Sequence, residues 1–376
     1  MSTNAPHIMR TALTALHATG LARGLAPLAR GQGVVFTLHS VTPEPVRPFE
    51  PNRILKVTPD FLETAIVTVR KRGYDIVSLD EAARRMRSET RERPFACFTL
   101  DDGYRDNRDH AYPVFKKHDA PFAIYVPAAY ADGEGDLWWY VLENAIAKTD
   151  RVRVVLDGIE RVFDATTAET KDRAFYEIYW PLRARPETEL RATVQAVAAE
   201  AGYDASRLCR DLIMSWDEIR ALAADPLVTI GAHTCRHFAV AKLSEEEARR
   251  EIADSVARIA CELGRPCRHF SFPYGDTASA GPRDFAIARA LGLETAVTTQ
   301  KDVVRRGVDR HGLPRVSLNG DYQAARFVEV LLTGVPFRMF DAAQTARAYA
   351  RRLAGARGKA AAIASPPIRR PDAASI

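Results

Sequence analysis

The chain lacks the features that define several large classes of protein. Its five cysteines are scattered and odd in number, and no C-x-x-C pair occurs, so we expect reduced thiols and no disulfide framework. No apolar run reaches the ~20 residues that a membrane-spanning helix requires. His17, Arg23 and Arg30 interrupt the N-terminal segment, which therefore lacks the continuous apolar core of a secretory signal.

Acidic residues are also missing from residues 1–30, which carry three arginines and a net charge of +3. Residues 338–376 carry a net charge of +6, so the total of +5 leaves a net charge of −4 for residues 31–337. A mildly acidic body with basic ends argues against an extended nucleic-acid surface, and we expect no nucleic-acid partner. The hydrophobic fraction of 47% and the charged fraction of 27% are those of an ordinary soluble globular protein.

The N-terminal segment contains leucines at a helical spacing, namely Leu13, Leu16, Leu21, Leu25 and Leu28. They predict a short amphipathic helix that is broken near Gly20 and Pro27. Residues 8–30 can pack on the domain or lie on a membrane surface, and the sequence leaves both placements open. We expect a cytoplasmic protein, with a peripheral position on the inner face of the membrane as the alternative.

Short β-rich runs alternate with helical segments from residue 33 onward. The runs are residues 33–40, 74–79, 94–100, 121–128, 226–234, 268–275, 294–299 and 312–318. Helices are predicted for residues 60–72, 244–263 and 282–291, where prolines and capping residues mark the N-termini. Because most runs are continuously apolar, we expect a parallel sheet covered by helices. A (β/α) barrel, or a distorted version of it, is the predicted fold, and a doubly wound open sheet is the alternative.

The regular alternation breaks between residues 131 and 215, where helical patterns replace the single helix that one crossover needs. We interpret this segment as a helical insertion over one face of the barrel. The expected organisation is an N-terminal amphipathic segment of residues 1–30, a barrel domain of residues 31–340 and a basic tail of residues 341–376. The Ala-, Arg- and Pro-rich composition of the tail predicts disorder.

Two adjacent carboxylates end the apolar run in "PFACFTLDDGYRDN", residues 94–107. Neighbouring side chains in a strand point to opposite faces, so a pair within the strand would bury one charge. At the carboxyl end of the strand, where Gly103 permits a sharp turn, Asp101 and Asp102 can both reach one site. A solvated Asp-Gly turn is the simpler interpretation of this motif when it is taken alone.

Two further polar clusters follow predicted strands, and (β/α) folds place their active sites at such carboxyl ends. One is "HTCRH", which contains His233 and His237, and the other is "SFPYG", residues 271–275. Two neutral imidazoles and one carboxylate form a three-ligand metal set that leaves a position open for water. The clusters together therefore predict a metal site, although the histidine pair alone would not.

The motifs "FTLDDG", "GAHT" with the following His237, and "FPYG" resemble, in order, the first three motifs of carbohydrate esterase family 4, the polysaccharide and chitooligosaccharide deacetylases. The resemblance covers about residues 33–320. It implies a distorted (β/α)7 barrel, a divalent metal, usually zinc, and an N-acetylated glycan as substrate. It also implies that Asp101 is the general base and that Asp102, His233 and His237 bind the metal. One carboxylate then holds the metal, and the other removes a proton from its water.

The chain departs from the family pattern in two places. Ser271 stands where many members have an arginine that orients the base, and Arg315 is the candidate to replace it or to contact the substrate. An ordinary surface arginine is the alternative interpretation of Arg315. The late Leu-x-His motif that carries the general acid is also missing. The chain resembles a subset of the family, the exopolysaccharide deacetylases that act on poly-N-acetylglucosamine, which carries this histidine in the first strand. This resemblance assigns the acid to His39, with His311 as the alternative.

Tyr274, Trp138 and Trp139 are the candidate substrate-binding aromatic residues, because such side chains stack on sugar rings as well as fill cores. The sequence thus predicts a metal-dependent N-deacetylase that acts on a sugar polymer, an oligosaccharide or a lipid-linked glycan precursor. The alternatives are a hydrolase of another non-peptide C–N amide bond on the same scaffold and a catalytically inactive carbohydrate-binding homologue.

Overall fold

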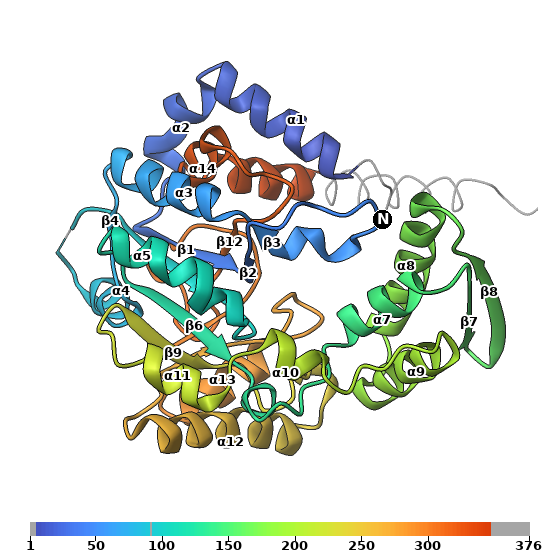
Figure 1. Cartoon of the computed structure of the whole chain (residues 1–376). Helices are drawn as coiled ribbons and strands as arrows, with labels where there is room; N and C mark the ends of the chain where they lie inside the picture. Colours follow the sequence, from blue (N-terminus) through green and yellow to red (C-terminus); the bar gives the residue numbers. More distant parts are fainter. Residues whose placement is uncertain (1–4, 91, 347–376) are drawn as a thin grey trace, which may run out of the picture.

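A curved sheet of parallel strands forms the centre of the computed structural model, which describes residues 5–90 and 92–346 (Figure 1). The strands run in the order β11-β10-β9-β6-β5-β1-β12, and β4 pairs with the start of β5. They are β1 (Gly33–Leu38), β4 (Asp75–Ile76), β5 (Phe95–Leu100), β6 (Phe122–Val126), β9 (Val228–Ala232), β10 (His269–Ser271), β11 (Thr295–Val297) and β12 (Val316–Ser317). Every residue of β1, β5 and β6 is buried, as the continuous apolar runs predict.

One segment connects the two edges of this sheet. Leu313 forms a parallel bridge with Val297 of β11, and three residues later Val316 pairs with Phe36 of β1. Residues 313–317 therefore cross from one edge strand to the other and give the sheet the form of a distorted (β/α) barrel. The predicted fold class is confirmed, although β4, β10 and β11 are shorter than the runs that predicted them.

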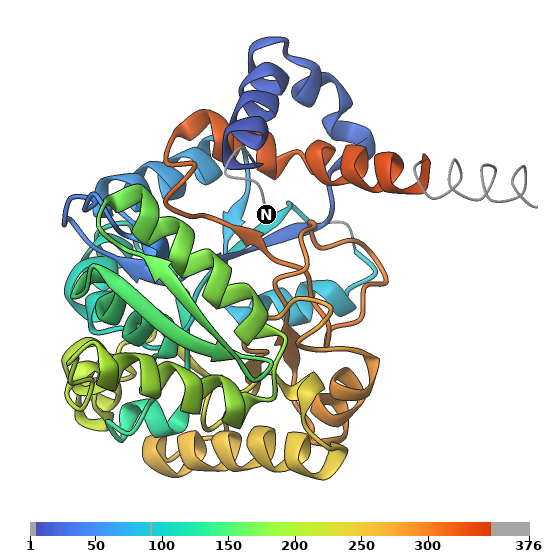
Figure 2. The ribbon, with the colours of Figure 1, turned by 90° about the vertical axis from the view of Figure 1, so that its right-hand side faces the viewer.

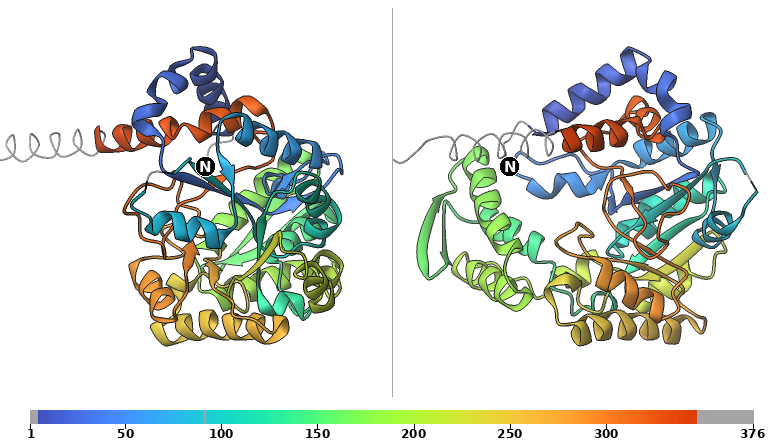
Figure 3. Two further views of the ribbon diagram at one scale, coloured as in Figure 1. Left: turned by 90° about the vertical axis from the view of Figure 1, so that its left-hand side faces the viewer. Right: turned by 180° about the vertical axis from the view of Figure 1, so that it is seen from behind.

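Helices cover the outside of the sheet (Figures 1 and 3). They are α3 (Pro59–Lys71), α4 (Leu79–Arg87), α5 (Tyr112–Lys117), α11 (Trp216–Leu222), α12 (Glu245–Leu263), α13 (Pro282–Ala290) and α14 (Ala325–Leu332). The three helices predicted from N-terminal signals begin and end within one residue of the expected bounds. At α12, for example, Ser244 and Glu247 form a reciprocal capping box.

The insertion between the first two motifs packs beside the strand ends, at the right of Figure 1. It contains α7 (Trp138–Ala147), β7 (Arg151–Leu156), β8 (Ile159–Asp164), α8 (Ala168–Arg183), α9 (Glu187–Glu200) and α10 (Leu208–Leu212). The antiparallel β7–β8 hairpin corrects the expectation of a wholly helical insertion. Alternate residues of β7 are buried, and Asp157-Gly158 forms its turn with positive φ at both positions. Both signals are present in the sequence.

Two N-terminal helices, α1 (Ala5–Ala18) and α2 (Leu21–Ala29), lie against α14 on the outside of the barrel (Figure 2). A further helix at 335–346 follows α14 and crosses the domain boundary expected at residue 340. The remainder of the expected tail, residues 347–376, lies outside the described residues. Over residues 5–90 and 92–346, no helix has both the length and the apolar character needed to cross a bilayer.

Short elements complete the described chain. They are β2 (Ser40–Val41), β3 (Lys56–Val57), α6 (Ala128–Ala131), the 3-10 helices Pro51–Leu55 and Val240–Lys242, and a π-helical turn at Asn107–Ala111. The π-helical turn directly follows the first motif and positions Asn107 beneath the end of β1, because its Nδ2 donates a hydrogen bond to the carbonyl oxygen of His39 at 2.7 Å.

Candidate active site

The strand ends bring the three polar motifs together at one edge of the sheet. Asp101 and Asp102 follow β5, His233 follows β9, and Ser271 ends β10. Because β5, β6, β9 and β10 are successive neighbours and all parallel, their carboxyl ends lie at the same edge. The arrangement is the one that (β/α) folds use for active sites.

Asp102, His233 and His237 form a compact buried cluster. Nε2 of His237 lies 3.2 Å and Nε2 of His233 lies 3.5 Å from Oδ1 of Asp102. One ligand atom from each residue lies within 4.8 Å of the others. Each of the three residues is less than 5% exposed. The structure thus brings together the three residues that the sequence predicts as metal ligands.

An unpaired carboxylate oxygen of this cluster fits a divalent cation. Oδ1 of Asp102 is buried without a hydrogen-bond partner among the described residues. Nδ1 of His233 donates to the carbonyl oxygen of Ser271 at 2.6 Å, which leaves the lone pair of its Nε2 directed at Asp102. A buried carboxylate oxygen with no donor is costly, and a cation held by two imidazoles and this oxygen would satisfy it.

The protonation states of Asp102 and His237 suit metal binding. Burial raises the pKa of Asp102, but the adjacent His233 and His237 outweigh burial and hold that pKa well below its usual range. Burial lowers the pKa of His237. The carboxyl group is therefore ionised and the His237 imidazole neutral at neutral pH.

Strained backbone conformations concentrate at this site. Six non-glycine residues of the described chain have positive φ, and four of them are Asp102 (76°), Thr234 (61°), His237 (58°) and Tyr274 (61°). Left-handed backbone at such residues costs on the order of 1–3 kcal/mol each and is retained where surrounding contacts enforce it. At the first motif, Asp102 and the left-handed Gly103 form the sharp turn that brings both carboxylates to one site.

Asp101 is held by Arg315, which the sequence offered as the replacement for the missing arginine of the third motif. Nη1 and Nη2 of Arg315 donate to the two carboxylate oxygens of Asp101 at 2.8 and 2.6 Å. Its remaining bonds go to the hydroxyl groups of Thr99 and Ser271 and to the carbonyl of Thr298. Arg315 is 0% exposed. Its guanidinium therefore orients Asp101 and is not open to a substrate, as the alternative assignment of Arg315 to substrate binding required.

The ionisation of Asp101 follows from this pairing. Burial raises the pKa of Asp101, but the charges of Arg315 and His233 and the hydrogen bonds from Arg315 outweigh burial and lower that pKa. Asp101 is therefore a carboxylate with both oxygens fixed, beside but outside the three-residue cluster. A carboxylate so placed can accept a proton.

His39 lies at the same edge of the sheet as Asp101. Leu38 pairs with Leu100, so the residues that follow them, His39 and Asp101, emerge side by side. The His39 ring is half-buried, and its charge contributes to lowering the pKa values of both Asp101 and Asp102. Its role as general acid stays a prediction.

His311, the alternative acid, lies elsewhere. Its Nε2 contacts the carbonyl oxygen of Leu293 at 2.8 Å, and its Nδ1 lies 3.4 Å from Asp309. Leu293 precedes β11, so this ring lies at the opposite end of the strand from the cluster. The position of His311 is thus that of a buried structural histidine.

The predicted substrate-binding aromatics pack around His237. Trp138 is 0% and Trp139 is 5% exposed, because α7 lies inside the insertion with eight of its ten residues buried. Nε1 of Trp138 donates to the hydroxyl of Tyr274 at 2.8 Å, and the rings of Trp139 and Tyr274 lie 5.1 and 4.8 Å from that of His237. They form an apolar wall of the site, and the two tryptophans offer no open face to a sugar.

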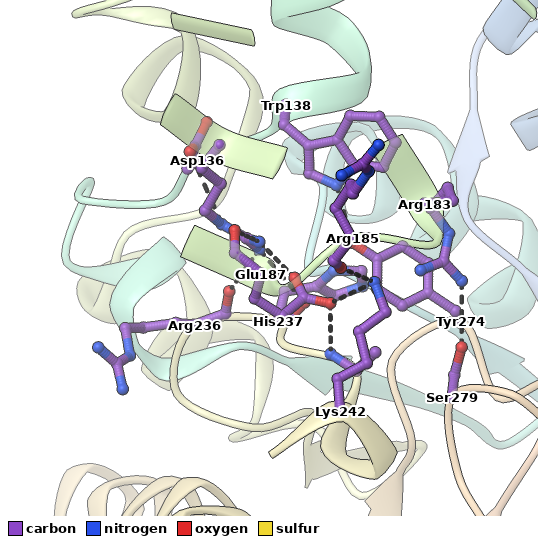
Figure 4. A network of polar contacts seen from close by, with 12 residues as sticks. Asp136, Trp138, Arg183, Arg185, Glu187, Arg236, His237, Lys242, Tyr274 and Ser279 are labelled. Atoms are coloured by element: carbon purple, nitrogen blue, oxygen red, sulfur yellow. Dashed lines mark hydrogen bonds and ion pairs between the residues drawn. The ribbon is translucent and has the colours of Figure 1, made fainter. Parts of the chain in front are cut away.

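Side chains from α8 and α9 that the motifs do not reveal support this wall (Figure 4). The guanidinium of Arg183 lies 3.6 Å from the ring centroid of Tyr274 and donates to Oγ of Ser279 at 3.1 Å. The buried Glu187 pairs with Arg191 and Lys242 and accepts a hydrogen bond from the backbone amide of Ala239. The only sequence signal for these residues is their charge within the otherwise amphipathic run 183–191.

Comparisons with known proteins agree with this geometry. Residues 88–296, more than half of the chain, match the polysaccharide deacetylase family. The comparison with curated proteins found no significant match.

Solved deacetylase structures share the fold. The *Streptococcus pyogenes* deacetylase PplD in complex with acetate is 15% identical, with 76% of this chain and 92% of that chain covered and a TM-score of 0.51. IcaB from *Ammonifex degensii* is 20% identical, covering 80% and 97%, with a TM-score of 0.50. A de-N-acetylase from *Aggregatibacter actinomycetemcomitans* is 14% identical, covering 79% and 99%, with a TM-score of 0.50.

We predict that replacing Arg315 with methionine lowers the free energy of unfolding by about 3–5 kcal/mol, because it leaves the Asp101 carboxylate buried without its partner. Urea denaturation measures this loss. The double variant D101N/R315M, which removes both charges, should be more stable than R315M alone.

Arg84 provides the matched control, because it forms a similar two-pronged pair with Glu81 while half exposed. R84M should cost no more than about 1 kcal/mol. Equal losses for R315M and R84M would contradict the assignment of a buried, structurally required pair.

Proposed function

Because the chain belongs to the polysaccharide deacetylase family, we propose that it is a metal-dependent hydrolase that removes N-acetyl groups from a glycan. The substrate class is a sugar polymer, an oligosaccharide or a lipid-linked glycan precursor. The observation that carries the proposal is the juxtaposition of two differently held carboxylates. Asp102 faces two histidines with an unsatisfied oxygen, and its neighbour Asp101 is fixed by Arg315.

Asp102, His233 and His237 would hold one divalent ion, and Zn²⁺ suits a set of two nitrogens and one oxygen best. Such an ion, when bound, supplies Lewis-acid polarisation of the acetyl carbonyl and acidifies water. Asp101 accepts the proton of the water that attacks the acetyl carbon. Its Oδ1 retains a free lone pair, because among the described residues it accepts only from Arg315, whereas Oδ2 accepts from both Arg315 and the hydroxyl of Ser271.

The leaving nitrogen must take up a proton as the C–N bond breaks, since an amine anion is a very poor leaving group. Of the two candidate acids, His39 and His311, His39 is better placed to donate this proton, because it follows β1 directly beside Asp101. A protonated imidazole gives its proton to the nitrogen, and the products are acetate and the free amine. His311, the alternative acid, instead contacts the carbonyl oxygen of Leu293, which precedes β11.

Exposed aromatics of α8 are better placed to bind a glycan than the buried tryptophans. Trp180 and Tyr176 are 44% and 38% exposed and lie one turn apart. Tyr176 donates from its hydroxyl to the carbonyl of Pro51 at 3.2 Å, and Arg183, on the same face, lies over Tyr274. This face of α8 therefore extends from Pro51 to the wall of the site. A sugar chain that lies along the face could stack on Trp180.

The proposed function predicts acetate release from N-acetylglucosamine oligomers by the purified protein. D101N should lose about 10²-fold or more of this rate, because an amide cannot accept the proton of the attacking water. D109N, at an exposed carboxylate, should retain the wild-type rate. Hydrolysis of small cyclic amides in place of the oligomers would instead support another amide hydrolase.

Metal content separates the roles of the residues. Wild-type protein and D101N should each carry about one divalent ion per chain by elemental analysis, whereas H237A should carry none while its circular-dichroism spectrum stays native. Metal retained by H237A would refute the ligand assignment. Metal bound without any hydrolysis would favour the inactive carbohydrate-binding homologue.

We predict that H39A keeps its metal but hydrolyses the N-acetyl amide slowly, with a loss on the order of 10²-fold. The defect should shrink for an activated aryl acetate, whose leaving group needs no proton. H311A, compared per folded and metal-loaded molecule, should show no such dependence on the leaving group. The reverse pattern would assign the acid to His311.

We also predict that W180A raises KM for a long oligomer about fivefold, the loss expected for one stacking contact of about 1 kcal/mol. KM for the shortest substrate and kcat for both should change little. F340A, which removes an equally exposed aromatic side chain from the helix at 335–346, is the control. An equal rise in KM for short and long substrates would argue against an extended sugar site on α8.

A further inference from the structure

Helix α2 shows the reverse of the usual burial pattern. Its small residues Ala22, Ala26 and Ala29 face the protein and are buried. Its leucines face outward, with Leu21 at 47%, Leu25 at 38% and Leu28 at 81% exposed. These leucines recur at positions i, i+4 and i+7 and form one continuous apolar face.

Two neighbouring helices carry four further exposed apolar side chains. Ile8 and Met9 of α1 are exposed, as are Met339 and Phe340 of the helix at 335–346. Seven of the fourteen exposed large hydrophobic residues in the described chain thus belong to these three helices, which lie next to one another in Figures 2 and 3. Such a cluster indicates a contact surface, because exposed apolar side chains are normally scattered singly over the surface of a soluble protein.

The charge of α1 and α2 is positive, because residues 5–30 contain Arg10, Arg23 and Arg30 and no acid. A groove beneath α1 and α2 is lined by Arg23, Arg30 and Arg72 against a single carboxylate, Glu329. His17 also contacts Glu329, at 3.0 Å. Arg23 and Arg72 both pair with Glu329, whereas Arg10 and Arg30 have no ion-pair partner among the described residues, so cations remain in excess beside the apolar face. Such a face complements a surface that is apolar within and anionic at its rim.

We propose that α1, α2 and the helix at 335–346 form a docking surface for an anionic lipid bilayer. The exposed leucines enter the boundary between headgroups and acyl chains, and Arg10, Arg23 and Arg30 pair with lipid phosphates. In Figure 1 these helices lie at the top, whereas the insertion and the strand ends lie to the right, so a bilayer seated on the helices leaves the active site accessible. The proposal is independent of the proposed enzymatic function.

Co-sedimentation of the full chain with vesicles tests the proposal. We expect binding to vesicles of phosphatidylglycerol mixed with phosphatidylcholine, at least tenfold weaker binding to phosphatidylcholine alone, and a fall in binding as salt is raised. The variant L21S/L25S/L28S should lose at least tenfold in partitioning to the anionic vesicles. Because these side chains are exposed, its thermal melting curve and its acetate release from a water-soluble oligomer should match the wild type.

The β7–β8 hairpin provides a matched control, because Val155, Ile159 and Val162 are equally large and exposed there. V155S/I159S/V162S should bind vesicles as the wild type does. Equal loss in the two triple variants, or no vesicle binding by the wild type, would overturn the proposal. A dimer by light scattering that L21S/L25S/L28S converts to monomer, without vesicle binding, would assign the surface to a second copy of the chain instead.

Discussion

The buried ion pair between Asp101 and Arg315 is the interaction on which the site depends. Neither charge could remain in this interior alone, because removal of one partner leaves an uncompensated buried ion. Asp101 ends β5 in the middle of the sheet, and Arg315 lies in the segment that connects β11 with β1. The segment that connects the two edges of the sheet therefore also orients the carboxylate of Asp101. The hydroxyls of Thr99 and Ser271 complete the pair by accepting the remaining hydrogen bonds.

Local chemistry explains which parts of this arrangement were predictable. Asp102, His233 and His237 could be found because residue type, spacing and strand ends all point to the same chemistry, and parallel strands align those ends without further information. The partner of Asp101 lies 214 positions away, in "LPRV", where nothing nearby distinguishes a buried arginine from an exposed one. Arg315 could therefore be offered as a candidate, but only tertiary packing gives it both oxygens of the carboxylate.

The insertion shows why the aromatic assignments required the structure. Trp138 and Trp139 begin a mostly apolar run, and two tryptophans in such a run are compatible with burial and with sugar contact until their neighbours are known. Because α8 and α9 pack against α7, Trp138 and Trp139 are buried, and Trp180 of α8 is exposed instead. The β7–β8 hairpin, by contrast, has two sequence signals of its own, namely the alternation of apolar and polar residues in β7 and the turn pair Asp157-Gly158. The strong helical patterns on either side led to a helical interpretation of the whole segment.

The insertion lies between the first and second motifs in sequence, yet it contacts the loops of the second and third. Those loops hold His237 and Tyr274 in left-handed conformations, each of which costs on the order of 1–3 kcal/mol. Exposed ion pairs are too weak to enforce such conformations, so buried contacts must do so. Glu187 binds the amide of Ala239, Arg191 reaches the carbonyl of His237, and Trp138 bonds to the hydroxyl of Tyr274. The insertion thus supports the strained loops, and the geometry of the cluster of Asp102, His233 and His237 depends on residues that lie outside the three sequence motifs.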